Sequence, residues 1–122
     1  MKKLLITLML ISPTSFADWG DVYYCQMTAF FEVTGKGEQH LRPLEKFKFT
    51  LDNTEKEAML FGKSGYLGGL YIPIDRASTL KDEWVARDRN SHIILAEETS
   101  FFLTQNYGAL GSTLIYADCD KF

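Results

Sequence analysis

The feature that most constrains the fold of this chain is an alternation of apolar and polar residues with a period of two. In its clearest stretch, Phe47, Phe49 and Leu51 alternate with polar residues. Neighbouring side chains on a β-strand point to opposite faces, so this alternation gives one apolar face and one polar face. Turn residues interrupt the pattern about every eight to twelve positions, which is typical of an all-β domain.

Segments of this kind recur along the chain and predict about eight strands. Pro73 lies inside one of them and cannot donate to a ladder hydrogen bond, so that strand belongs at a sheet edge or at a bulge. Residues 88–91 have the composition of a hairpin turn. The sum predicts a single antiparallel meander, folded as a small closed barrel or, as the alternative, as a β-sandwich. The expected strands are 22–33, 47–52, 58–62, 70–74, 83–87, 92–96, 100–107 and 113–119.

Residues 1–17 have the layout of a secretory signal peptide. Two lysines precede an apolar run over residues 4–11, and Ser15 and Ala17 are the small residues of a cleavage site. The apolar run is too short to span a bilayer, so we expect no membrane insertion after signal cleavage. Cleavage would leave 105 of the 122 residues, enough for a single β-domain at 18–122. We therefore expect a periplasmic or secreted protein.

The two cysteines, Cys25 and Cys119, lie near opposite ends of this domain. In an oxidising compartment such a pair is most simply a disulfide. Cys119 shares a strand face with Ile115 and Ala117, which favours a buried, inward-facing bridge. A closed barrel brings its first and last strands together, so the expected disulfide also favours closure. A covalent loop of about 100 residues stabilises a fold by up to roughly 4–5 kcal/mol in the chain-entropy description.

The charge of the mature chain restricts its partners. The expected signal peptide carries two lysines and no acids. The mature chain therefore has 11 basic and 16 acidic side chains and a net charge of −5. An acidic chain without a lysine and arginine cluster is poorly suited to phosphate backbones or anionic lipid. We expect no nucleic-acid partner, and a cationic protein partner would be attracted electrostatically.

No motif for catalysis, metal binding or cofactor binding stands out. Gly62-Lys63-Ser64 resembles the end of a phosphate-binding loop, but Glu57 stands where that motif needs its first glycine. The remaining side chains that could take part in catalysis or metal binding do not have the spacing of metal ligands. They are better explained as solvated surface acids and histidines. We therefore expect no catalytic residues, no metal and no cofactor. The side chains considered are His40, His92, Glu97, Glu98, Asp118 and Asp120.

Three pairs of adjacent aromatic residues interrupt the strict alternation: Tyr23-Tyr24, Phe30-Phe31 and Phe101-Phe102. Because neighbours on a strand face opposite sides, one ring of each pair should point out of the core unless a bulge intervenes. The outward rings either form an apolar patch or line a cleft, or they reflect irregular packing. The sequence leaves these alternatives open.

Tyr23-Tyr24-Cys25 opens the mature domain, Cys119 closes it, and Ser64-Gly65-Tyr66 lies in the glycine-rich loop between them. In outline this resembles the periplasmic inhibitors of c-type lysozyme (MliC type), small exported barrels that pair a tyrosine-x-cysteine with a C-terminal cysteine. Those inhibitors insert a serine-glycine-x-x-tyrosine loop into the lysozyme cleft; here Gly68 stands where that tyrosine would be. The resemblance implies a lysozyme inhibitor, with Ser64 and Tyr66 as the inserted residues.

The resulting expectation is an exported, non-enzymatic binding module that contacts a protein partner through the glycine-rich loop. Glycines let the backbone approach a partner closely, and loops commonly carry binding functions. The alternatives are a lipocalin-like carrier of a small apolar ligand, for which the aromatic content leaves little interior space, and a hydrolase of envelope glycans or esters. The expected contact residues are Lys63, Ser64, Gly65, Tyr66, Gly68 and Gly69.

Overall fold

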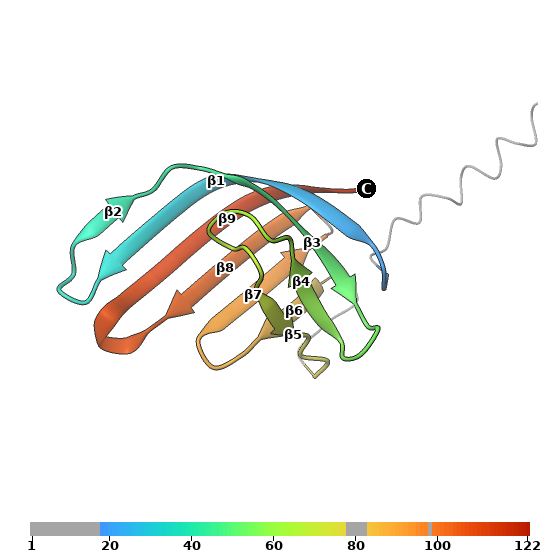
Figure 1. Cartoon of the computed structure of the whole chain (residues 1–122). Helices are drawn as coiled ribbons and strands as arrows, with labels where there is room; N and C mark the ends of the chain where they lie inside the picture. The colour runs from blue at the N-terminus through green and yellow to red at the C-terminus, as the bar shows by residue number, and fades with distance from the viewer. Residues whose placement is uncertain (1–17, 78–82, 98) are drawn as a thin grey trace, which may run out of the picture.

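The computed structural model describes residues 18–77, 83–97 and 99–122 (Figure 1), so the expected signal peptide at 1–17 lies outside the described part of the chain. The described residues fold as strands joined by turns, with a single short 3-10 turn, η1, at Gly108–Leu110. No described helix is long and apolar enough to cross a membrane. The strands are β1 Val22–Thr34, β2 Gln39–Leu41, β3 Lys46–Asp52, β4 Ala58–Phe61, β5 Tyr71–Pro73, β6 Glu83–Arg87, β7 Ser91–Ala96, β8 Ser100–Asn106 and β9 Gly111–Lys121.

All strand pairings within the sheet are antiparallel, in the order β5-β4-β3-β1-β9-β8-β7-β6. The first and last strands, β1 and β9, pair along almost their whole length, as a barrel requires (Figure 1). At the other edge, β5 and β6 meet through one bridge between Ile74 and Ala86 and a 2.7 Å hydrogen bond from the Asp75 amide to the Val85 carbonyl. The prediction of an all-β antiparallel barrel is confirmed, with one seam left largely unsealed.

Two details at the sheet edges test the sequence reasoning. Pro73 is the last residue of β5, which ends the sheet order, so its expected place at an edge is confirmed. Strand β2 was not expected, because its three residues are all exposed and carry no alternation. It pairs with residues Phe31–Val33 of β1. Together β1, β2, β8 and β9 form an extension of the sheet, which lies at the left of Figure 1.

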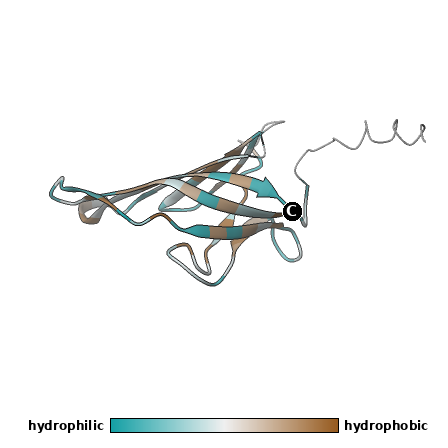
Figure 2. Cartoon of the chain, turned by 90° about the horizontal axis from the view of Figure 1, so that it is seen from above, coloured by the Kyte–Doolittle hydropathy of each residue, from teal (hydrophilic) through white to brown (hydrophobic). Residues whose placement is uncertain are grey.

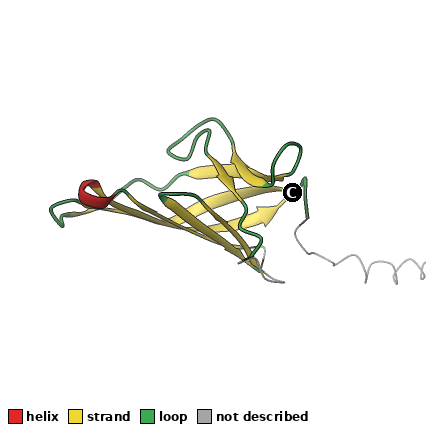
Figure 3. Ribbon diagram, turned by 90° about the horizontal axis from the view of Figure 1, so that it is seen from below, coloured by secondary structure: helices red, strands yellow, loops and turns green. Residues whose placement is uncertain are grey.

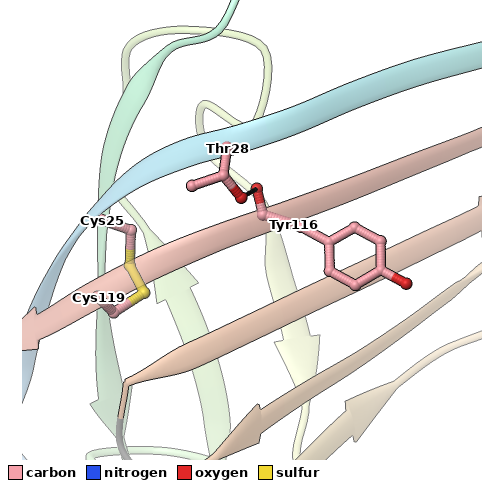
Figure 4. Close-up of a disulfide and its surroundings, with 4 residues drawn as sticks. All are labelled: Cys25, Thr28, Tyr116 and Cys119. Atoms are coloured by element: carbon pink, nitrogen blue, oxygen red, sulfur yellow. Dashed lines mark hydrogen bonds between the residues drawn. A yellow bond between two sulfur atoms is a disulfide. The ribbon is translucent and has the colours of Figure 1, made fainter.

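A β-bulge in β1 decides which of its residues face inward. The pairing with β9 shifts register between Met27 and Ala29, and the hydroxyl of the bulged Thr28 lies 3.3 Å from the Tyr116 carbonyl oxygen (Figure 4). One extra residue reverses the facing of every residue that follows. Tyr23 before the bulge and Phe30 after it therefore both lie in the core, although they are an odd number of positions apart.

One cluster of buried apolar side chains forms the core inside the barrel. Cys25 and Cys119 are register partners and form the expected disulfide, with only 4% and 3% of each residue exposed (Figure 4). Near this bridge, aromatic rings pack against one another at centroid separations of 4.9–6.1 Å. Apolar and polar residues alternate along the strands in Figure 2, as the period-two pattern predicts. The clustered rings are Tyr23, Phe47, Phe49, Phe61 and Phe101.

Candidate functional site

One end of the barrel interior is polar. Ser91, Gln105, Thr113 and Glu32 are register partners across β7, β8, β9 and β1, and we call these four residues the polar row. The first three are at most 5% exposed, and the Gln105 amide nitrogen donates to the Ser91 hydroxyl at 3.1 Å. Burying polar groups costs free energy unless they are hydrogen-bonded. Four neighbouring strands thus place polar side chains at the same level, where hydrogen bonds offset part of the cost of burying them.

The levels deeper in the barrel are apolar. One step in from the polar row, Phe30, Ile115, Leu103 and Ile93 are register partners, and all four are buried. Each of these strands thus changes from apolar to polar inward residues at the same end of the barrel. Sequence reasoning missed this row, although a signal was present. The buried positions of β7 begin with Ser91, those of β8 end with Gln105, and those of β9 include Thr113 next to Gly111.

A loop over residues 62–70 closes this end, which we call the loop end. It connects β4 to β5 and is drawn in yellow-green across β9 and β8 in Figure 1. Leu67 is buried in the core. The ring of Tyr66 packs edge-on against Phe30 at 4.8 Å, and its hydroxyl lies 3.2 Å from the Thr113 hydroxyl and 3.5 Å from the Gln105 side-chain oxygen. Tyr66 therefore covers the polar row.

Hydrogen bonds within the loop hold it in one conformation. The amide of Gly69 donates to the carbonyl of Gly62 at 2.8 Å, and the amide of Tyr66 donates to a Glu45 carboxylate oxygen at 2.9 Å. A side chain at Gly68 would place its Cβ 2.5 Å from the Lys63 carbonyl oxygen, and Gly65 has a φ of 85°. Both glycines are required by close approach or by left-handed backbone. The loop is compact and anchored.

The structure separates the expected contact residues into a tip and an anchor. Lys63, Ser64 and Gly65 are exposed at the tip, as is Gly69. Tyr66 and Gly68 are only partly exposed, and Tyr66 points toward the barrel. Lys63, Ser64 and Gly65 are consequently available to a partner without rearrangement, whereas Tyr66 contacts its own chain. That Tyr66 touches a partner stays a prediction.

Beside Tyr66, the loop end contains a recess of about 160 Å³ between β1, β9 and η1. The turn η1, red in Figure 3, lies where β8 and β9 extend farthest. Burial, followed by the charges of Tyr66 and Asp88, raises the pKa of Tyr107 above its ordinary value of 10.0. The lining combines two phenol rings with one carboxylate. Among its residues are Glu32, Thr34, Tyr66, Tyr107, Leu110 and Thr113.

The carboxylate of the recess is already paired with a cation. The Arg42 guanidinium donates to a Glu32 carboxylate oxygen at 2.8 Å, and it also lies 5.5 Å from the centroid of the Phe30 ring. The Arg42 side chain is 43% exposed and that of Glu32 is 29% exposed. A pair this accessible to water contributes little to stability, so its partners are free to exchange.

The opposite face of the same strands carries an apolar groove of about 460 Å³. Phe31, Val33 and Leu114 line it, and one step along the strands the rings of Phe102 and Tyr116 pack at 4.6 Å. The expectation that each aromatic pair has one inward member is confirmed: Tyr23, Phe30 and Phe101 are buried, and their neighbours are more exposed. The sequence left open whether the outward rings form an apolar patch, line a cleft or reflect irregular packing. For Phe31, the structure shows a ring that lines a cleft.

Elsewhere the described residues offer little chemistry. His40, His92, Asp118 and Asp120 are exposed, and Glu98 lies outside the described residues. Within residues 18–77, 83–97 and 99–122, no three His, Cys, Asp or Glu side chains form a group that could hold a metal ion.

Among the described residues, we take the loop end and the outer groove as the candidate sites. Comparison of the chain with known protein families, curated proteins and solved structures finds no match.

Proposed function

We propose that this protein is a non-enzymatic binding module that contacts a protein partner at the loop end. The observation that supports this most directly is the anchored loop: Tyr66 and Leu67 fix it to the barrel, and Lys63, Ser64 and Gly65 stand exposed at its tip. A loop that is already ordered loses little conformational entropy on binding. The buried disulfide is consistent with action in an oxidising compartment outside the cytoplasm.

We further propose c-type lysozyme as the first partner to test. The catalytic cleft of a glycosidase holds a pair of carboxyl groups. A tip that presents the ammonium of Lys63 and the hydroxyl of Ser64 from a rigid loop has the charge and hydrogen-bonding groups to complement such a pair. The acidic balance of the chain, with 16 acids, also favours association with a basic enzyme.

The test is a cell-wall lysis assay with c-type lysozyme, run with increasing amounts of the disulfide-bonded protein. We expect inhibition that weakens by about tenfold or more in the variant Lys63→Ala/Ser64→Ala, because tip contacts at an interface centre dominate binding. The matched control is Thr54→Ala/Lys56→Ala, which removes the same two groups from the exposed turn at the other end of β4.

Equal inhibition by both variants would rule out the loop tip as the contact. Absence of any inhibition would reject lysozyme as the partner. In that case, binding of the same variants to partners captured from the periplasm or culture medium decides whether the loop tip is the contact.

A second candidate function rests on the outer groove. Its volume of about 460 Å³ and the apolar side chains of Phe31, Val33 and Leu114 among its lining suit a small apolar ligand, because ligand sites are concave and mostly apolar. The barrel interior, by contrast, is filled by aromatic rings. Native mass spectrometry of the purified protein, compared with its denatured mass, tests this candidate. A native mass higher by a few hundred daltons would favour a carried ligand, and equal masses would count against it.

A further inference from the structure

We propose that the recess beside Tyr66 binds one cationic side chain, a lysine or an arginine, of the protein partner. This inference rests on the proposed function and adds the chemistry by which the partner is recognised. The recess has a volume of about 160 Å³, which suits the end of one side chain. Its lining supplies aromatic rings and a carboxylate, the two groups that bind ammonium and guanidinium ions.

The rings are placed by elements on opposite sides of the recess. Tyr66 comes from the loop over 62–70, where Phe30 and Thr113 hold its ring and hydroxyl in place. Tyr107 precedes η1 and is 42% exposed. A cation over the face of a tyrosine is attracted by the ring quadrupole, more strongly where water is partly excluded. The recess thus places two phenol rings and one carboxylate around a single small volume.

Acidic side chains lie at and near the recess. Glu32 lies in the recess, Glu45 bonds the Tyr66 amide, and Asp88 is close enough to contribute to the raised pKa of Tyr107. Arg42 is the cation paired with Glu32. Among the described residues that line the recess, Glu32 is the one charged side chain, and its negative charge favours the approach of a partner cation.

An arginine of the chain itself already binds at this place in the same way. Arg42 binds Glu32 at 2.8 Å and lies over the Phe30 ring, so the rim of the recess already holds a guanidinium from its own chain. A partner cation would compete with Arg42 for Glu32. The exchange costs little, because exposed ion pairs contribute only about 0–1 kcal/mol.

A second pair of the same construction provides the control. Arg76 binds Glu57 at 2.8 Å and lies 5.6 Å from the Trp19 ring, at a site remote in the sheet order from the recess. Both pairs thus combine an arginine, a glutamate and an aromatic ring. The tyrosine-lined recess adjoins only Glu32. Identical substitutions in the two pairs therefore change the net charge equally but affect the recess differently.

The experiment titrates the isotope-labelled, disulfide-bonded protein with n-butylguanidinium, n-butylammonium and, as the neutral probe, n-pentanol, observed by NMR. We expect both cations to shift the signals of Tyr66, Tyr107 and Thr113, with weak saturable binding, and pentanol to leave them unshifted. Shifts by pentanol equal to those by the cations, shifts spread over the whole surface, or no shifts at all would overturn the proposal.

The variants sharpen the test. Glu32→Gln should weaken binding of n-butylguanidinium by about two- to fivefold, the range of an exposed charge pair, while Glu57→Gln should leave it unchanged. Arg42→Gln should strengthen it by a similar factor, because the competing guanidinium is gone, whereas Arg76→Gln should not. Equal effects at the two pairs would show general charge attraction and would contradict a specific recess.

These measurements need no partner, so their outcome is independent of the lysozyme assay. Lys63→Ala/Ser64→Ala should bind the probes as the parent protein does, since the tip lies outside the recess lining. If that variant loses partner binding and the parent protein does not bind the probes, the proposed function is retained and the recess is rejected. If the parent protein binds the probes and the variant binds the partner unchanged, the recess is retained and the loop tip is rejected as the contact.

Discussion

The two ends of the barrel are built from the same strands but by different chemistry. At the end that holds the disulfide, Cys119 and Phe101 point inward and rings fill the interior. At the loop end, Thr113 and Gln105 occupy the corresponding inward positions of β9 and β8 and are covered by Tyr66. The first end contributes apolar burial and a covalent bond. The second contains hydrogen-bonded polar groups, a recess and an exposed loop.

This difference is consistent with the proposal that one end of the sheet stabilises the fold and the other contacts a partner. Apolar burial stabilises a fold by about 25 cal/mol per Å², whereas a buried hydrogen bond has a net contribution of only about 0.5–1.5 kcal/mol. An end made of polar side chains is therefore a poor choice for stability alone. The same end carries the loop whose tip we propose as the contact with a partner.

The largest expected effect is at the disulfide end. Phe101→Ala removes a ring that contacts Phe47, Phe49 and Phe61. Truncating a buried phenylalanine of this kind lowers the free energy of unfolding by about 3–5 kcal/mol. Urea unfolding monitored by circular dichroism measures the loss. A decrease below about 1 kcal/mol would contradict the importance of this ring cluster.

The next effect concerns the covalent bond. Replacing both cysteines, Cys25→Ala/Cys119→Ala, opens a loop with a sequence separation of 94 residues. Removing a native disulfide from a small exported domain costs about 2–5 kcal/mol, chiefly because the unfolded chain gains freedom. Urea unfolding of the double variant checks this value. Because the bridge is remote from the recess, probe binding under folding conditions should persist, and its loss would contradict the separation of the two ends.

A smaller effect is expected at the loop end. Tyr66→Phe keeps the ring against Phe30 and removes the hydroxyl that contacts Thr113. The free energy of unfolding should fall by only about 0.5–1.5 kcal/mol, the contribution of one hydrogen bond. Faster amide hydrogen exchange should be confined to residues 62–70. Faster exchange throughout the sheet would contradict a local role for this tyrosine.

The smallest effect is electrostatic. Burial first, and then the charges of Tyr66 and Asp88, raise the pKa of Tyr107 above 10.0, so its phenol stays neutral to a higher pH in the folded protein. The unfolded chain loses this proton first as pH rises, so Tyr107 disfavours the folded state above about pH 10. Asp88→Asn should lower the pKa of Tyr107, although burial keeps it raised. NMR titration of the Tyr107 ring carbon measures the change; an unchanged midpoint would contradict the contribution of Asp88.

Much of the fold was predictable because its signals are local. Alternation located the strands, Pro73 indicated an edge, and Cys119 shared a face with Ile115. Strand β2 was missed because pairing with β1, rather than any pattern of its own, makes it a strand. The incomplete closure between β5 and β6 was also missed, because it depends on the lengths of these strands, which turn residues do not determine.

The candidate site was only partly predictable. The glycine-rich loop was evident from the sequence, and the exposure of Lys63 and Ser64 at its tip agrees with their expected position. The inward orientation of Tyr66 was not evident, since it depends on contacts with Phe30 and Thr113 from distant strands. The polar row also depends on the register of four strands and on the bulge at Thr28, which places Glu32 inward.

The central proposal is that the loop end serves recognition and that the polar row beneath it contributes little to stability, and one measurement tests the second part most directly. The variant Ser91→Ala/Gln105→Leu/Thr113→Val replaces hydrogen-bonding partners together, and water can reach the partly exposed Tyr66. Replacing both partners of a buried hydrogen bond with apolar groups is nearly neutral or stabilising. The account predicts a free energy of unfolding within about 1 kcal/mol of the parent protein in urea. A decrease of about 3 kcal/mol or more, as large as that expected for Phe101→Ala, would contradict it.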